Sequence, residues 1–288
     1  MSATILDGKV LSRKLIAQLK AEVDELKIQT GKTPCFVNIV IGNDESAASY
    51  GKSQKRTAEA IGIDYRFAYL PQQLTQKELL DHVKFLNEDP LVHGVMIHKP
   101  VPEGIDFQQA ANMIVAHKDL EGMGEANLGR LFMDKTQIIP CTPASAMALL
   151  EASGVDIAGK DAVIVGRSEI VGKPMIHLLL KKNATVTVCH SGTSRAGRLV
   201  DHVKQAEILI VAMGKPGFIK GEWVREGAIV IDVGINALDG KIVGDVEFDV
   251  ASSRAAFITP VPGGVGPVTA VMLMKNGIET FKHQLRAA

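Results

Sequence analysis

Short apolar runs rich in β-branched residues alternate with segments of helical spacing along this 288-residue chain. Helical spacing extends over residues 10–28, an apolar run follows at 35–43, and helical spacing returns up to residue 61. Strands that alternate with helices form sheets that are largely parallel. The sequence therefore predicts an α/β protein, and the restart of the alternation near residue 143 predicts two α/β units.

The same pattern suggests where the domains begin and end. We expect a first domain over residues 1–142 and a second over 143–268. The last segment, 269–288, has helical spacing and lies beyond the second domain. We expect this helix to return and pack on the first domain.

Composition excludes several classes of function. The 32 basic residues balance 32 acidic ones, which argues against nucleic acid or an anionic membrane as a partner. Cys35, Cys141 and Cys189 are odd in number and widely spaced, so neither a disulfide framework nor a metal site is expected. No window has the roughly 18 apolar residues of a spanning helix, and the first residues lack a signal-peptide core. We expect a soluble, cytoplasmic protein.

A nucleotide site is indicated where the apolar run 162–165 leads into Gly166 and a helix follows from Met175. A glycine after a parallel strand lets a ligand approach the backbone, and a helix N-terminus offers free N–H groups to phosphate. The second domain is therefore expected to be a Rossmann-like NAD(P)-binding domain. The spacing is not G-x-G-x-x-G, so an ordinary turn between strand and helix remains the alternative.

The next strand bears on which nucleotide is bound. NAD-selective sites place a carboxylate at its end, whereas this strand ends in Cys189-His190-Ser191. Arg167 in the glycine loop would accommodate a 2′-phosphate. These residues favour NADP over NAD, with a solvated loop charge as the alternative role of Arg167.

Several longer segments match one family. They are GRSEIVGKP at 166–174, CHSGT at 189–193, KPGFIKGEWVREGAIVIDVGIN at 215–236, TPVPGGVGPVT at 259–269 and PCTP at 140–143. The chain thereby resembles the methylenetetrahydrofolate dehydrogenase/cyclohydrolase family over essentially its whole length. The resemblance implies two α/β domains flanking a cleft, in a homodimer that binds folate mainly with the first domain, the substrate domain, and NADP with the second. It also implies that the cofactor site consists of Gly166, Arg167, Ser168, Ser191 and Ile235. Pro262, Gly263 and Gly264 are implied to lie at the mouth of the cleft and to bind substrate.

The chain departs from the family pattern at the catalytic lysine. The pattern is Tyr-x-x-x-Lys on a helix, and here Tyr50 is followed by Gln54. Lys55 and Lys52 are rotated away from Gln54 by roughly 100° and 200°, so neither should face the same cleft. We take Tyr50, Gln54 and His98 as the candidate catalytic residues.

Two further segments of the folate pocket also differ. Gln-Leu-Pro-Leu-Pro becomes His98-Lys99-Pro100-Val101-Pro102, and Lys-Asp-Val-Asp-Gly becomes Lys118-Asp119-Leu120-Glu121-Gly122. The resemblance makes Tyr50, His98, Lys99, Asp119 and Glu121 the candidate substrate-binding residues. Three changes in one pocket indicate a coordinated rebuilding, with independent drift as the alternative, and a histidine there is a candidate acid or base.

The two family reactions demand different groups. Hydride transfer needs two rings held in position, whereas hydrolysis of the methenyl product needs proton transfer, which an amide does not perform. We expect an NADP-dependent methylenetetrahydrofolate dehydrogenase with weak or absent cyclohydrolase activity. The alternatives are a paralogue that oxidises another pterin or a cyclic aminal or imine, a bifunctional enzyme in which Lys99 or His98 replaces the lysine, and a binding protein without turnover.

Overall fold

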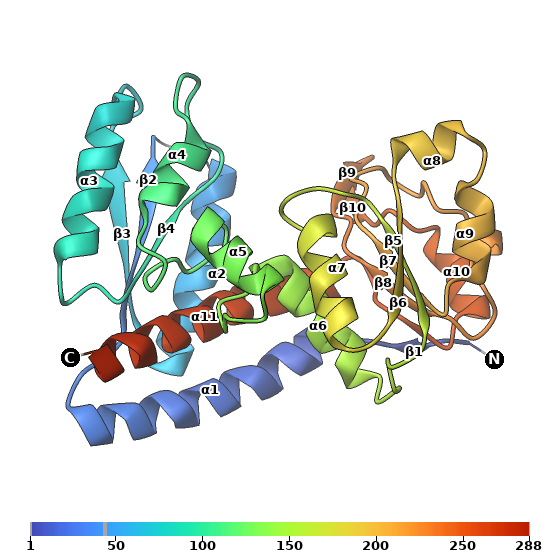
Figure 1. Ribbon diagram of the computed structural model, residues 1–288, viewed down its shortest axis with the longest axis horizontal. Coiled ribbons are helices and arrows are strands. Elements are labelled where there is room, and N and C mark those ends of the chain that lie inside the picture. Colours follow the sequence, from blue (N-terminus) through green and yellow to red (C-terminus); the bar gives the residue numbers. More distant parts are fainter. Residues whose placement is uncertain (1, 43–44, 288) are drawn as a thin grey trace. The chain divides into compact units, whose positions relative to one another are not determined.

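The computed structural model describes residues 2–42 and 45–287, without the side chains of 45–50 and 287. The chain divides into two compact units (Figure 1). One contains Met1–Ser12 and Thr142–Thr269, and the other contains Arg13–Cys141 and Ala270–Ala288. The divisions fall inside α1 (Gly8–Thr30) and α11 (Val265–Ala287) and at the start of α6 (Cys141–Ala152).

The beginning of the chain differs from the predicted first domain. Met1–Ser12 belongs with the unit that contains Thr142–Thr269, because β1 (Thr4–Ile5) pairs in parallel with β11 (Phe257–Ile258) at the end of the large sheet. A two-residue strand is too short to show a periodic pattern. The last helix behaves as predicted, since Ala270–Ala288 belongs with Arg13–Cys141.

The unit that contains Thr142–Thr269 is built on a six-stranded parallel sheet in the order β1-β11-β8-β7-β5-β6. Helix α7 (Gly172–Lys181) lies on one face, and α9 (Leu199–Gln205) and α10 (Phe248–Arg254) lie on the other (Figure 1). Because helices cover both faces of the sheet, side chains on both sides of the central strands are buried, and these strands are continuous apolar runs in the sequence. The remaining elements are β5 (Asp161–Val165), β6 (Thr185–Cys189), α8 (Ser191–Arg195), β7 (Ile208–Val211), the 3₁₀ turn Gly221–Trp223, β8 (Ile229–Asp232) and a hairpin of β9 (Asn236–Leu238) and β10 (Lys241–Val243).

The other unit contains a three-stranded parallel sheet with β2 (Cys35–Ile41) between β3 (Asp64–Leu70) and β4 (Gly94–Ile97). One face packs on α3 (Gln76–Glu88) and α4 (Phe107–Met113), and the other packs on α1, α2 (Glu45–Ile61) and α11. The chain then forms α5 (Glu125–Phe132). Asn38 is the single polar residue of β2 and is fully buried.

No helix in residues 2–42 or 45–287 is long and apolar enough to cross a membrane.

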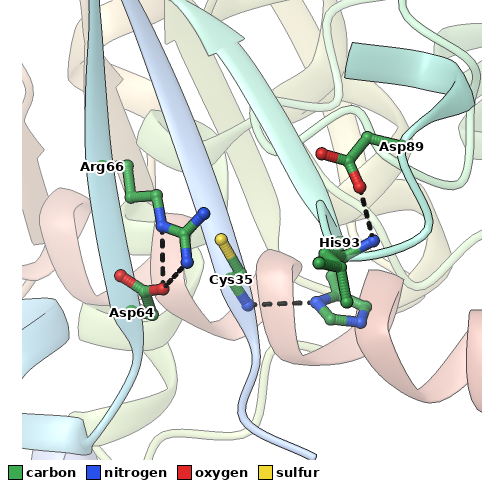
Figure 2. A network of polar contacts seen from close by, with 6 residues as sticks. Cys35, Asp64, Arg66, Asp89 and His93 are labelled. Atoms are coloured by element: carbon green, nitrogen blue, oxygen red, sulfur yellow. Dashed lines mark hydrogen bonds and ion pairs between the residues drawn. The ribbon is translucent and has the colours of Figure 1, made fainter. Parts of the chain in front are cut away.

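The amino edge of the smaller sheet holds a network of polar contacts (Figure 2). The backbone N–H of Cys35 donates to Nδ1 of His93 at 3.1 Å. Burial, together with the nearby Lys118 ammonium, lowers the pKa of His93 to about 4. Lys118 donates to the carbonyls of Leu86, Asn87 and Asp89 just beyond this edge. The network ties strands to the end of α3 and is structural.

His93 gives this unit a defined acid sensitivity. Its pKa is near 6.5 in the unfolded chain and about 4 when folded, so the unfolded state binds the proton first. The free energy of unfolding should therefore fall by up to about 1.4 kcal/mol per pH unit as pH drops from about 6.5 to about 4. The His93→Asn variant keeps an acceptor for Cys35 without a titrating ring and should flatten this part of the profile. Chemical unfolding at a series of pH values measures it, and an unchanged slope would contradict the assignment; His202→Asn on α9 is the control.

Candidate active site

His98 and Lys99 follow β4 at the carboxyl edge of the smaller sheet. The backbone N–H of His98 donates to the carbonyl of Ile39 at 2.8 Å, and its side chain is buried. Lys99 is exposed, and its ammonium lies 3.7 Å from the centroid of the Phe107 ring. A cation held over an aromatic face in this way gains favourable electrostatic interaction with the ring. The two residues, although adjacent, therefore have different surroundings.

Gln54 is buried in α2 with 2% of its surface exposed. Its Oε1 accepts a hydrogen bond from the Tyr65 hydroxyl at 3.0 Å and from Nδ2 of Asn38 at 3.3 Å. The same Asn38 nitrogen lies 3.3 Å from Nδ1 of His98. Gln54 and His98, both predicted from the sequence, thus belong to one hydrogen-bond network.

The neighbouring lysines of α2 lie on its solvent side, as predicted from helical rotation. Lys52 is exposed, and the ammonium of exposed Lys55 lies 3.9 Å from the Glu59 carboxylate. Neither lysine replaces an ammonium at position 54. Tyr50 lies in α2, but its side chain is outside the described part of the structure.

Asp119 is buried, and its carboxylate is occupied within the chain. One oxygen accepts the N–H groups of Glu121 and Gly122, and the other accepts the N–H of Gly124 and the amide of Asn127, at 2.9 to 3.1 Å. Burial raises the pKa of this carboxyl, and the four donors oppose that rise. The geometry favours a positioning role for Asp119, which shapes the segment carrying Glu121, over the predicted direct contact with substrate.

Glu121 is half-buried and has an unusual carboxyl group. Burial and the nearby Asp119 carboxylate raise its pKa to about 7, although the Lys99 ammonium acts in the opposite direction. Near neutral pH Glu121 therefore changes between a carboxylate, which only accepts hydrogen bonds, and a carboxylic acid, which also donates.

The predicted cofactor residues lie at the carboxyl edge of the larger sheet. Gly166 directly follows β5, Ser191 follows β6 closely, and Ile235 follows β8. The chain passes from β5 to β6 on one side and returns to β7 on the other, so the strand order reverses at β5. Ligands of open parallel sheets bind at such a reversal, beyond the carboxyl ends of the strands.

Backbone geometry at this edge requires glycine. Gly166 has φ +136°, and a Cβ there would overlap the carbonyl oxygen of Ala212 after β7. A Cβ at Gly172 would likewise overlap the carbonyl oxygen of Gly166. The loops after β5 and β7 therefore lie against each other, as expected where a cofactor meets the backbone.

Polar side chains complete this edge. The Ser168 hydroxyl accepts the N–H of Val171 at 3.1 Å and so holds the turn before α7, whereas Arg167 and Ser191 are exposed. Nδ1 of His190 accepts the N–H of Gly192 at 3.0 Å. Arg195 is exposed four residues after Ser191 on α8, a spacing that places both on one helix face. Arg195, which no sequence motif singled out, is thereby a further candidate residue of this edge.

Pro262, Gly263 and Gly264 belong to the unit that contains the predicted cofactor residues. Gly263 has φ +109°, and its carbonyl accepts the N–H of Gly8 at 2.9 Å. A Cβ at Gly264 would lie 2.6 Å from the carbonyl oxygen of Pro260. The turn therefore requires its glycines for close backbone packing.

Asn38 and Tyr65 belong to the hydrogen-bond network of Gln54 and His98, but neither was identified from the sequence. Asn38 had a visible signal, since one amide interrupts an otherwise apolar strand. Tyr65 had none, because an aromatic residue is ordinary in a strand.

Family models match both parts of the chain. The model described as tetrahydrofolate dehydrogenase/cyclohydrolase, catalytic domain, matches residues 6–121. The model of the same family's NAD(P)-binding domain matches residues 140–285.

Curated proteins and solved structures agree with these matches. The bifunctional protein FolD of Bacillus pumilus is 44% identical, over 99% of this chain and 100% of that protein. The bifunctional FolD structure from Campylobacter jejuni is 41% identical, with TM-score 0.94, and covers 98% of this chain and 99% of its own. The Trypanosoma brucei methylenetetrahydrofolate dehydrogenase-cyclohydrolase, complexed with NADP and inhibitor, is 38% identical with TM-score 0.93 and covers 99% of both chains. This chain belongs to the tetrahydrofolate dehydrogenase/cyclohydrolase family.

Proposed function

We propose that the protein is an NADP-dependent 5,10-methylenetetrahydrofolate dehydrogenase whose methenyltetrahydrofolate cyclohydrolase activity is weak or absent. The observation that carries this proposal is the buried amide of Gln54, hydrogen-bonded to Tyr65 and Asn38 at the position of the family lysine. The class of reaction is inferred from membership of the family. The buried amide of Gln54 is the reason to expect dehydrogenase activity without strong cyclohydrolase activity.

Dehydrogenation makes modest demands on the substrate-side residues. When bound, NADP supplies the acceptor for the hydride that leaves the methylene group of the substrate. The loops that follow β5, β6 and β8 would hold it through Gly166, Arg167, Ser168, Ser191 and Ile235. The glycine contacts at this edge fit such a ligand, because they bring backbone rather than side chains to the surface. Neither binding nor orientation requires a titrating group at position 54.

Hydrolysis of the methenyl product makes a different demand. A group must take a proton from the attacking water and return one to the departing nitrogen, which contributes roughly 10² to 10⁴-fold in rate. The amide of Gln54 does neither near neutral pH. The Lys99 ammonium lies over Phe107, which favours a role outside proton transfer. Hydrolysis should therefore suffer far more than hydride transfer.

The proposal is tested by adding methylenetetrahydrofolate with NADP or NAD to the purified full chain and measuring NADPH or NADH formation. We expect turnover with a higher kcat/KM for NADP. Calorimetric titration with tetrahydrofolate derivatives should show binding, and no binding at millimolar ligand would favour a non-folate substrate. Sedimentation of the protein tests the homodimer that family membership suggests.

Arg167→Ala should weaken NADP binding selectively. Hydrogen bonds to charged groups contribute about 1.5 to 3 kcal/mol, so we expect KM for NADP to rise roughly 10- to 100-fold while KM for NAD changes little. Steady-state kinetics with both cofactors measures the difference. Arg225→Ala, an exposed arginine of the same unit, is the control. Equal effects on NADP and NAD would show that Arg167 does not meet the 2′-phosphate.

Glu121 should make substrate binding depend on pH. Above its pKa of about 7 the carboxylate accepts two N–H donors of a pterin, and below it the acid loses that capacity. We expect KM for methylenetetrahydrofolate to rise as pH falls through about 7, and Glu121→Gln to abolish this dependence. A wild-type KM independent of pH over this range would contradict a role of Glu121 in substrate binding.

Burial of Glu121 also makes the stability of the fold depend on pH. Because ionised Glu121 destabilises the folded state, the free energy of unfolding should fall as pH rises from about 4.5 through about 7.

A further inference from the structure

Asn38 connects the two altered positions of the substrate-side network. Its side chain is fully buried in the middle strand of the smaller sheet, on the face that packs against α2. Nδ2 lies 3.3 Å from Oε1 of Gln54 and 3.3 Å from Nδ1 of His98. Its Oδ1 is buried and has no hydrogen-bond partner within the part of the chain that the structure describes. One amide group thus lies between residue 54 and the imidazole.

The donors and acceptors of this arrangement can be assigned by counting. An amide nitrogen carries two hydrogens, and here they reach two acceptors, Gln54 Oε1 and His98 Nδ1. The opposite amide orientation would turn Oδ1 towards both neighbours and leave two N–H donors buried without partners. One unpaired carbonyl oxygen is better tolerated than two unpaired donors. The observed orientation is therefore favoured, and it requires Nδ1 of His98 to be an acceptor.

We propose that Asn38 is a positioning residue that transmits the hydrogen-bonding character of residue 54 to His98 and so fixes which imidazole nitrogen carries the proton. With glutamine at position 54, Asn38 donates to both neighbours, and neutral His98 carries its proton on Nε2. Only the catalytic consequence rests on the proposed function. An imidazole in this form offers an N–H at Nε2 and does not accept a proton there, so His98 does not replace the missing lysine as a base through that nitrogen.

A lysine at position 54 would reverse the direction of these hydrogen bonds. Its ammonium can only donate, so it would face another donor, the N–H of Asn38, with no acceptor between them. Turning the Asn38 amide relieves this conflict, because Oδ1 then accepts from the ammonium. A hydrogen bond to a buried charge is stronger than one between neutral groups, so it outweighs the cost of the two amide N–H groups that the turn leaves unpaired. The same oxygen faces Nδ1 of His98, which becomes the protonated nitrogen. Gln54→Lys should thus move the imidazole proton from Nε2 to Nδ1 through Asn38.

The test is ¹⁵N–¹H two-bond correlation spectroscopy of the uniformly ¹⁵N-labelled full chain, at a pH where the imidazole is neutral. His98→Gln identifies the His98 signals by their loss. His93 and His190 provide internal references, because their Nδ1 atoms accept from backbone N–H groups, which only donate. In the wild type, His98 should show the same pattern as these two, with a protonated Nε2.

Three variants separate positioning from a general structural effect. Gln54→Lys should reverse the His98 pattern, and Asn38→Leu should average it between the two tautomers. Tyr65→Phe removes another contact of Gln54 but not its acceptor oxygen, and should leave the pattern unchanged. Unaltered His93 and His190 signals show that each variant is folded.

A protonated Nδ1 in wild-type His98, or an unchanged pattern in folded Gln54→Lys, would overturn the proposal. Should Asn38→Leu fail to fold, the wild type and Gln54→Lys still decide it. The spectrum does not depend on turnover. An inactive protein with the expected pattern would therefore refute the proposed function and leave this inference intact.

Discussion

Gln54→Lys is expected to raise the hydrolysis of methenyltetrahydrofolate by roughly 10- to 100-fold, which lies at or below the low end of what a placed acid or base contributes. NADPH formation should change by less than about threefold, because hydride transfer needs no proton carrier at this position. Recovery should be incomplete, since burial lowers the pKa of an ammonium and the Asn38 amide, which donates to Gln54, must turn before it can accept from an ammonium at position 54. Loss of methenyltetrahydrofolate absorbance without cofactor measures the hydrolysis.

Ser53→Lys is the matched control for this variant. Ser53 precedes Gln54 on α2 and is exposed, so the variant adds the same charge on the solvent side. It should leave both rates unchanged. Equal gains in the two variants, or no gain in Gln54→Lys, would show that the lost lysine does not explain weak hydrolysis.

Asp119→Ala is expected to have the largest effect on the fold and on substrate affinity together. Four donors would lose their buried acceptor, so the free energy of unfolding should fall by about 3 to 5 kcal/mol. The segment carrying Glu121 should lose its shape, and KM for methylenetetrahydrofolate should rise roughly 100-fold, the equivalent of about 2.8 kcal/mol. Calorimetric affinity for NADP should change less than about twofold, because the predicted cofactor residues belong to the other unit.

Asp106→Ala provides the comparison, because the Asp106 carboxylate caps the start of α4 by accepting the N–H of Gln109 at 3.0 Å. Loss of such a helix cap costs about 1 kcal/mol. Urea unfolding followed by circular dichroism compares the two variants. A similar loss in both, with substrate KM unchanged in Asp119→Ala, would contradict the positioning role of Asp119.

Elements with long periodic patterns were predictable from the sequence, whereas β1 and the β9–β10 hairpin were not. The expected strand over 35–43 is β2, Cys35–Ile41, and the expected helix over 10–28 is α1, Gly8–Thr30. Strand β1 and the β9–β10 hairpin span two or three residues each, and their pairing depends on contacts that a local pattern does not contain. The assignment of Met1–Ser12 was wrong for this reason.

In the candidate site, too, local motifs were predictable from the sequence, whereas contacts between residues distant in the sequence were not. Motifs identified Gln54, His98 and Glu121 by position, and helical rotation correctly placed Lys52 and Lys55 on the solvent side. The contacts that give Gln54 and His98 their chemistry come from Asn38, which is 16 and 60 residues away from them. Such contacts depend on the strand order of the sheet, and no spacing rule within the sequence predicts them.

Following both products of one reaction distinguishes a dehydrogenase with weak cyclohydrolase activity from a bifunctional enzyme. The wild-type protein is mixed with methylenetetrahydrofolate and NADP, and NADPH and methenyltetrahydrofolate are measured at early times, with spontaneous hydrolysis subtracted from an enzyme-free reaction. We predict that methenyltetrahydrofolate accumulates in nearly one-to-one proportion to NADPH. NADPH formation without accumulation of the methenyl compound, with 10-formyltetrahydrofolate as the principal product, would show that the protein has strong cyclohydrolase activity and would contradict the proposed function.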